Sequence, residues 1–244
     1  MRGSLSLLRL LPLALALLVV TCGAGAAPPT PGVYLADGGD RLDVAREAEG
    51  LGFSLDVTGA NGHTCALDGT LQGELGFTRA HDDDPASLCR THLHAEGDAI
   101  RVEALTPDTC RDHCGARAWF EGDYRRAAPA CVPEAAEATR ARFLRQYQAK
   151  DYANAERTLA TLLDGCGKTL FWLDAAQVRT DLALTQYHLG DRAGCLRTLA
   201  PVLERAGSGA EDVRSSLPPS DADGFLPIAR AAWHNAALCK APPR

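Results

Sequence analysis

The hydrophobic period changes along this chain, and the change constrains the fold more than any other feature. Up to about residue 124, apolar and polar residues alternate, as at Phe53, Leu55 and Val57, which is typical of strands that bury one face. Beyond about residue 133, apolar residues such as Ala155 and Leu159 recur at helical spacing. The pattern predicts an α+β chain, with a small antiparallel β barrel or sandwich followed by an all-helical domain.

Turn residues divide the first half into short strands. Asn61-Gly62 is a hairpin turn signal, and a returning strand is expected over residues 64–67. Residues 88–95 and 99–105 should form a second hairpin. A two-residue turn at Asn61-Gly62 would place Cys65 on the face opposite the apolar residues of the preceding strand. Either that loop is longer than two residues, or the disulfide of Cys65 lies on the outer face.

Helical spacing divides the second half into five expected helices. They cover residues 134–150, 152–163, 174–187, 195–203 and 225–238. Asp174 can cap the third helix, and Asp221 or Asp223 the last. Pro201 should kink or split the fourth helix. Residues 207–219 are polar and contain Gly, Ser and Pro, so they are predicted to form a loop.

The first 26 residues have the features of a secretory signal. Two arginines precede an apolar run over residues 10–20, and Ala24 and Ala26 stand at the positions that a signal peptidase reads. The run is shorter than the ~20 residues that a membrane span needs. Cys22 ends a segment that resembles a bacterial lipobox, although Thr21 departs from that pattern, so a lipid anchor at Cys22 is the alternative. We therefore expect a periplasmic or secreted protein.

Charge changes at the same boundary as the hydrophobic period. Residues 27–133 contain 18 acidic and 9 basic side chains, a net charge of −9, whereas residues 134–244 contain 13 acidic and 14 basic ones, a net charge of +1. We expect a β domain over residues 27–126, a linker over 127–133 and a helical domain over 134–240. A pI of about 5.6 does not fit a nucleic-acid binder. The acidic β domain could instead receive a cationic partner.

Removal of the signal would leave eight cysteines, an even number that predicts a disulfide framework in an exported chain. They are Cys65, Cys89, Cys110, Cys114, Cys131, Cys166, Cys195 and Cys239. Proximity in the sequence favours Cys65–Cys89 and Cys110–Cys114 in a disulfide-bonded β domain. Pairing of Cys110 or Cys114 with an earlier strand is the alternative.

The remaining four cysteines are expected to pair within the helical half and across its start. Cys195 should face the next helix, and Cys239 lies at the end of that helix, so Cys195–Cys239 is the preferred pair. Cys131 and Cys166 then remain, and their bond would tie the domain junction to the first helical hairpin. Each bond would typically stabilise the fold by ~2–4 kcal/mol.

The helical half contains two related units. The clearer one has Leu182-Ala183, Tyr187, Leu189-Gly190-Asp191, Cys195, Leu199 and Val202, and the earlier one has Lys150-Asp151-Tyr152, Ala155, Leu159 and Leu162. This half resembles the tetratricopeptide repeat, in which a large and a small residue occur early in the first helix and Gly occupies the turn. The two turns are 40 residues apart, against about 34 in that family, which requires an insertion around residues 165–171.

The tetratricopeptide resemblance implies a scaffold that binds other proteins without catalysis. Its concave face would present first-helix residues, here Arg142, Gln146, Arg179 and Gln186. A generic disulfide-bonded helical bundle is the alternative interpretation of the same helices.

The β half offers a looser resemblance. Residues 110–124 are similar to the closing segment of small secreted proteobacterial cysteine-containing modules. Length, acidity and the expected barrel are similar to those of periplasmic lysozyme inhibitors. No inhibitory motif can be carried over residue by residue, so the likeness concerns the fold alone. It implies, as an alternative function, inhibition of a cationic envelope hydrolase such as lysozyme through the β domain.

Histidines in the β half raise a third hypothesis, metal binding. His63, His81, His92, His94 and His113 lie among the β-domain cysteines, and His92 and His94 share one strand face. Imidazole and thiolate are good zinc and copper ligands. The paired CxxC or HxxxH spacing of most zinc sites is absent, however, so we assign no metal ligand and no cofactor.

Catalytic motifs are absent from the sequence. It contains no GxSxG elbow, no HExxH and no Walker loop. The even cysteine count argues against a free catalytic thiol. The sequence therefore predicts a non-catalytic protein-binding or assembly protein of the cell envelope, with no catalytic residues.

Overall fold

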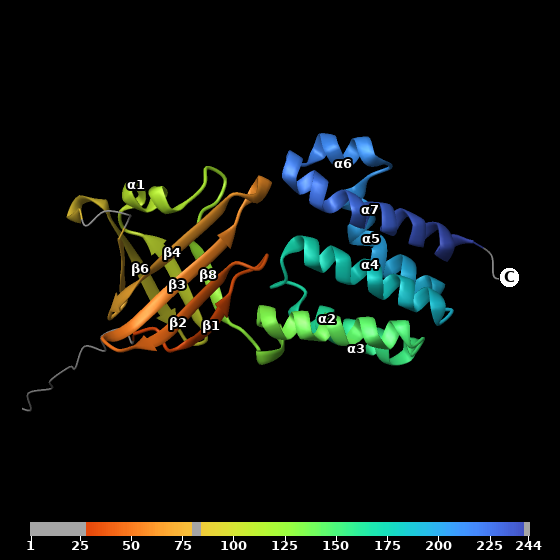
Figure 1. Cartoon of the computed structure of the whole chain (residues 1–244), viewed down its shortest axis with the longest axis horizontal. Coiled ribbons are helices and arrows are strands. Elements are labelled where there is room, and N and C mark those ends of the chain that lie inside the picture. Colours follow the sequence, from red (N-terminus) through yellow and green to blue (C-terminus); the bar gives the residue numbers. More distant parts are fainter. Residues whose placement is uncertain (1–27, 80–83, 242–244) are drawn as a thin grey trace, which may run out of the picture.

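A computed structural model describes residues 28–79 and 84–241, and it shows an α+β protein in which a β barrel is followed by packed helices (Figure 1). The signal sequence, Cys22 and His81 lie outside the described residues. Across the part that is described, no helix has both the length and the apolarity to cross a membrane.

Eight antiparallel strands form a closed barrel, in which each strand pairs with its neighbour in sequence and β8 returns to β1. The strands are β1 (Gly32–Leu35), β2 (Arg41–Glu47), β3 (Gly50–Thr58), β4 (Thr64–Gln72), β5 (Leu75–Arg79), β6 (Leu88–Glu96), β7 (Ala99–Ala104) and β8 (Gly122–Arg126). Alternation along each strand turns Leu42, Leu55, Leu67 and Leu93 inward, where all four are buried. The barrel alternative is therefore confirmed over the sandwich.

The connection between β3 and β4 is longer than the Asn61-Gly62 signal indicates. It contains a short 3₁₀ turn, η1 (Ala60–Gly62), in which Asn61 has a φ of 63°. The register pairs Val57 with Cys65, so Cys65 points into the core and is only 1% exposed. Of the two alternatives for Cys65, the longer loop is correct.

Strand β4 also extends beyond the expected residues 64–67. It continues through Gly69 to Gln72, because a glycine inside the barrel leaves room for a neighbouring ring. A Cβ on Gly69 would come within 2.7 Å of Cε1 of Phe53. The second expected hairpin is confirmed as β6 and β7.

Short helical elements complete the barrel module. They are η2 (Pro85–Ser87), α1 (Pro107–Cys110), η3 (Arg111–His113) and η4 (Pro129–Cys131). Leu105, the residue after β7, donates its N–H to the carbonyl of Arg90 on β6, and helix α1 packs against this strand. This return places Cys110 beside Cys89.

Six further helices form the second module. They are α2 (Pro133–Gln148), α3 (Tyr152–Cys166), α4 (Trp172–His188), α5 (Arg192–Ala206), α6 (Ala210–Ser216) and α7 (Pro219–Lys240). Helices α2 and α3 form one antiparallel hairpin and α4 and α5 a second, while α6 and α7 pack at the far side of the second hairpin (Figure 1).

The two hairpins turn in the same way, 40 residues apart. Lys150 and Gly190 both have positive φ, at 59° and 84°. In each case the next residue is an aspartate that caps the following helix: Asp151 accepts from the N–H of Asn154, and Asp191 from that of Gly194. The two hairpins are thus built alike.

Helices α4 and α5 each differ from the expectation in one respect. Helix α4 begins at Trp172, so Asp174 lies in its first turn and pairs with Arg140 instead of capping the helix. Pro201 stays inside an unbroken α5, since Leu199 and Val202 beside it are buried and hold the helix against its neighbours.

Residues 207–219 are not simply a loop. Helix α6 forms there because Val213 is fully buried in the core of the second hairpin. Helix α7 then starts at Pro219, which suits a first helical position, and neither Asp221 nor Asp223 is its cap.

Four disulfides link the eight cysteines. Cys131–Cys166 and Cys195–Cys239 are confirmed. They are of the kind that persists in an oxidising compartment.

The pairing expected from sequence proximity in the β domain is wrong. The bonds are Cys65–Cys114 and Cys89–Cys110, so Cys110 and Cys114 both pair with earlier strands. The turn of η3 separates those two cysteines and directs them to different strands.

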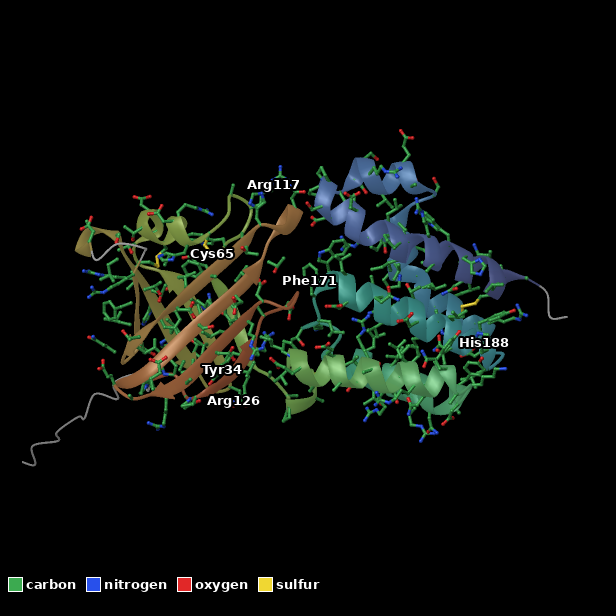
Figure 2. The ribbon with its side chains drawn as sticks, in the orientation of Figure 1. Tyr34, Cys65, Arg117, Arg126, Phe171 and His188 are labelled. Carbon is green, nitrogen blue, oxygen red and sulfur yellow. A yellow bond between two sulfur atoms is a disulfide. The ribbon has the colours of Figure 1, made fainter. Side chains whose placement is uncertain are left out.

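Backbone contacts join the barrel to the helices. The tip of the β1–β2 turn docks on the α3–α4 loop, where Gly38 donates its N–H to the carbonyl of Lys168 at 2.8 Å. Phe171, at the end of that loop, lies between the two modules (Figure 2). At a second contact, Asn61 donates its N–H to Asp221 at 3.0 Å. Asp221 thus connects the modules.

Candidate functional site

Two cavities flank the α3–α4 loop at the junction of the modules. The first has a volume of about 380 Å³ and lies towards α2, and the second has a volume of about 240 Å³ and lies towards α5 and α7. Both are lined in part by Leu170 and by a glycine of the β1–β2 turn, Gly39 in the first and Gly38 in the second. The docked turn therefore forms one wall of each cavity.

The second cavity, which we call the basic groove, combines positive charge with apolar walls. It is lined by Gly38, Gly167, Lys168, Leu170, Trp172, Ala175, Ala176, Arg179, Pro201, Val202, Arg205 and Phe225. Lys168, Arg179 and Arg205 are its charged residues. None of the three forms an ion pair within residues 28–79 and 84–241. Three uncompensated cations therefore face one small cavity in an acidic protein.

The fold holds these cations around one aromatic ring. Trp172 starts α4 and packs on Phe225 of α7, with ring centroids 5.4 Å apart. Arg179 lies seven residues further along α4, and seven residues return to the same face of a helix. The guanidinium of Arg205, from the last turn of α5, lies 5.0 Å from the Trp172 ring centroid. The ring is thus fixed, while Lys168 and Arg205 are exposed and Arg179 is half-buried.

The first cavity has balanced charges instead. Arg140 donates to Asp174 across it at 2.9 Å, and Glu137 also lines it. The charge of Arg140 is therefore neutralised inside the protein. Of the two junction cavities, the basic groove is therefore the candidate site for a charged ligand.

The residues expected on a concave face take three different positions. Arg179 lines the basic groove, and Arg142 is exposed on α2. Gln146 and Gln186 are half-buried, and their amide oxygens accept from Thr158 and Thr198 within their own hairpins, at 2.9 and 2.8 Å. Of the four, only Arg179 lines the groove.

The sequence did not indicate Lys168, Trp172 or Arg205 as site residues. They come from a loop, the start of one helix and the end of another. No spacing in the sequence links them, because their proximity depends on how α4, α5 and α7 pack.

The histidines are mostly dispersed in the barrel. His92 and His94 lie together on β6, with Glu74 between them, whereas His63 packs against the backbone at Gly115. Desolvation opposes ionisation of Glu74, but hydrogen bonds from His92, from the N–H of Ala95 and from His94 outweigh it and lower the pKa of this carboxyl. All eight cysteines that the structure describes are in disulfides, so none of these eight offers a thiolate.

Comparison with known proteins identifies no family. No family model matches the chain, and neither curated proteins nor solved structures include a significant match. We therefore infer function from the side chains of the site.

Proposed function

We propose that this chain is a non-catalytic binding protein of the cell envelope, and that the basic groove holds an acidic segment of a partner protein. The observation that carries the proposal is that Lys168, Arg179 and Arg205 line one groove with Trp172 and have no ion-pair partner among the described residues. A ligand with carboxylates would supply the missing charges, and an apolar side chain beside them would contact Trp172 and Phe225.

The size of the groove fits a few side chains. Its volume of about 240 Å³ is below the ~300–1,000 Å³ of pockets that enclose a whole small molecule. A peptide segment could place one or two side chains in it and extend along the neighbouring helices. This favours a protein partner over an enclosed metabolite.

The composition of the groove supports binding without chemistry. Among the described residues, its lining includes no carboxylate, histidine, hydroxyl or thiol side chain. Guanidinium groups stay protonated at physiological pH and donate hydrogen bonds, so Arg179 and Arg205 suit recognition of carboxylates.

Peptide display on the intact, oxidised protein tests the proposal. Random peptides are selected on the wild-type chain and counter-selected on the Arg179→Ala/Arg205→Ala variant. We expect the enriched peptides to carry Asp or Glu next to an apolar residue. Their affinity should fall at least tenfold in the double variant and with increasing salt.

The control for peptide binding removes two exposed arginines from equivalent positions of α3 and α5, Arg157 and Arg197. The Arg157→Ala/Arg197→Ala variant should bind the selected peptides like the wild type. Enrichment of peptides without acidic residues would refute the assignment of the groove. An equal loss of peptide affinity in both double variants would also refute it. If peptide binding is lost in the single variant Arg142→Ala, the result would instead favour the concave face implied by the tetratricopeptide resemblance.

The second candidate function, inhibition of a cationic hydrolase, is favoured by the charge of the barrel module. Glu47, Glu49, Asp56 and Asp68 are all exposed on β2, β3, β4 and the turn between β2 and β3. We propose that such a partner would dock on this acidic surface. The test is lysozyme activity on cell walls with the full chain added. Inhibition that disappears in Asp56→Asn/Asp68→Asn supports it, and no inhibition at equimolar protein refutes it.

A further inference from the structure

Three metal-ligand side chains converge on the outside of the barrel, where the β4–β5 turn meets β6. Nε2 of His92 lies 3.2 Å from Oε2 of Glu74, and Nδ1 of His94 lies 3.0 Å from Oε1 of the same carboxylate. One ligand atom from each residue can be chosen so that all three lie within 4.8 Å of one another. Two imidazoles and one carboxylate therefore already surround one point.

The backbone fixes this arrangement. His92 and His94 are two residues apart on β6, so strand geometry turns both to the outer face. Pairing of Leu75 with His92 brings Glu74 beside them, and the carbonyl of Glu74 accepts the N–H of Leu93 at 2.8 Å. The N–H of Ala95 donates to Oε1 of Glu74 at 3.3 Å. The carboxylate is thus positioned by the sheet and not by the histidines alone.

A second carboxylate orients one of the imidazoles. Nε2 of His94 lies 3.3 Å from Oε1 of Glu96, on the side of the ring away from Glu74. When a metal ion takes the place of the proton on Nδ1, Nε2 keeps the ring proton and donates to Glu96. Carboxylates that hold a ligating histidine in this way are a common outer shell of metal sites.

We propose that Glu74, His92 and His94 bind a divalent transition-metal ion, with Glu96 as a positioning residue. Nitrogen and carboxylate donors suit Zn²⁺ and Cu²⁺, and the disulfides leave no thiolate within residues 28–79 and 84–241 to select a softer ion. On binding, the metal would replace protons between the carboxylate and the two ring nitrogens.

The site would be open on its outer side. The side chains of His92 and His94 are 32% and 37% exposed, and that of Glu74 is 15% exposed. Three protein ligands leave a fourth position for water or for a donor from another molecule. The site lies on the barrel module, whereas the basic groove lies mainly between helices, so neither proposal depends on the other.

Titration calorimetry with Zn²⁺ or Cu²⁺ alone, on the full oxidised protein at pH 7.5, tests the site. We expect one ion bound per chain, and loss of that binding in His92→Ala/His94→Ala. The Glu96→Gln variant should bind about 10–100-fold more weakly, the usual effect of removing an outer-shell carboxylate. Ca²⁺ should not compete, because it prefers sites built entirely from oxygen.

The matched control removes two histidines from elsewhere, in His63→Ala/His188→Ala, and should bind like the wild type. Electron paramagnetic resonance of the Cu²⁺ form adds a readout that does not depend on affinity. Two nitrogen ligands are expected in the wild type and one in His92→Ala. Absence of stoichiometric binding by either ion in the wild type, or unchanged binding in His92→Ala/His94→Ala, would overturn the proposal.

Discussion

Asp181 on α4 provides the sharpest test of the electrostatics of the helical module. Its carboxylate accepts a hydrogen bond from Nε2 of Gln177 at 2.8 Å. Burial raises the pKa of Asp181 to about 6 from an ordinary value of 3.8, although the bond from Gln177 and the charge of Arg140 act in the opposite direction. The folded protein therefore holds a proton there that the unfolded chain releases at lower pH.

The sign and size of the effect follow from this difference. Because the folded-state pKa is the higher one, the stabilising contribution of Asp181 is fully present below pH 3.8 and is lost as the pH rises through about 6. The difference between the two values, at 1.36 kcal/mol per pH unit, gives about 3 kcal/mol at most. An asparagine keeps the acceptor for Gln177 and never ionises.

We expect Asp181→Asn to be more stable than the wild type by up to about 3 kcal/mol at pH 8, and nearly equal to it at pH 4. Urea unfolding at several pH values, without reductant, measures the difference. Asp164→Asn, on the exposed face of α3, controls for the loss of one negative charge. A difference between Asp181→Asn and wild type that stays constant from pH 4 to pH 8 would refute the reasoning.

Three further predictions concern stability. The hydroxyl of Thr91 is buried without a hydrogen-bond partner among the described residues. Thr91→Val should therefore stabilise the barrel by about 1 kcal/mol in urea unfolding. Destabilisation would show that the hydroxyl does have a hydrogen-bond partner. A Cβ on Gly39 would lie 2.8 Å from the backbone nitrogen of Phe171, whereas one on Gly38 meets nothing within 4 Å, and both residues have positive φ. Gly39→Ala should therefore lower the melting temperature more than Gly38→Ala, and equal effects would contradict docking of the turn. The cysteines of the Cys195–Cys239 bond are 44 residues apart, so its loss should lower the free energy of unfolding by about 4 kcal/mol. The loss should be equal in Cys195→Ala, Cys239→Ala and the double variant. Unequal free energies of unfolding in urea among these three variants would count against the bond.

The sequence predicted those features that depend on local pattern. Alternation and turn residues located the β6–β7 hairpin, and the spacing of apolar residues located both helical hairpins. The Cys195–Cys239 bond was also predictable, because both residues lie on helices that pack directly together.

Features that depend on strand register or on packing between distant elements were missed. Cys89 pairs with Cys110 because the β6–β7 hairpin returns the chain to the start of β6. Glu74 joins His92 and His94 through the register of β5 on β6, and that register has no signature in the spacing of the three residues.

The loop between α3 and α4 explains why the barrel contacts the helices beside the basic groove. Lys150 and Gly190 are 40 residues apart, and between them the chain leaves α3 after Cys166 and enters α4 at Trp172, so residues 167–171 form a loop. The tip of the β1–β2 turn docks on this loop, and both junction cavities are lined by it. A shorter connection would remove the contact of Gly38 with Lys168 and also one cation of the basic groove. The same loop therefore joins the modules and lines the basic groove, so the proposed partner would contact both modules there.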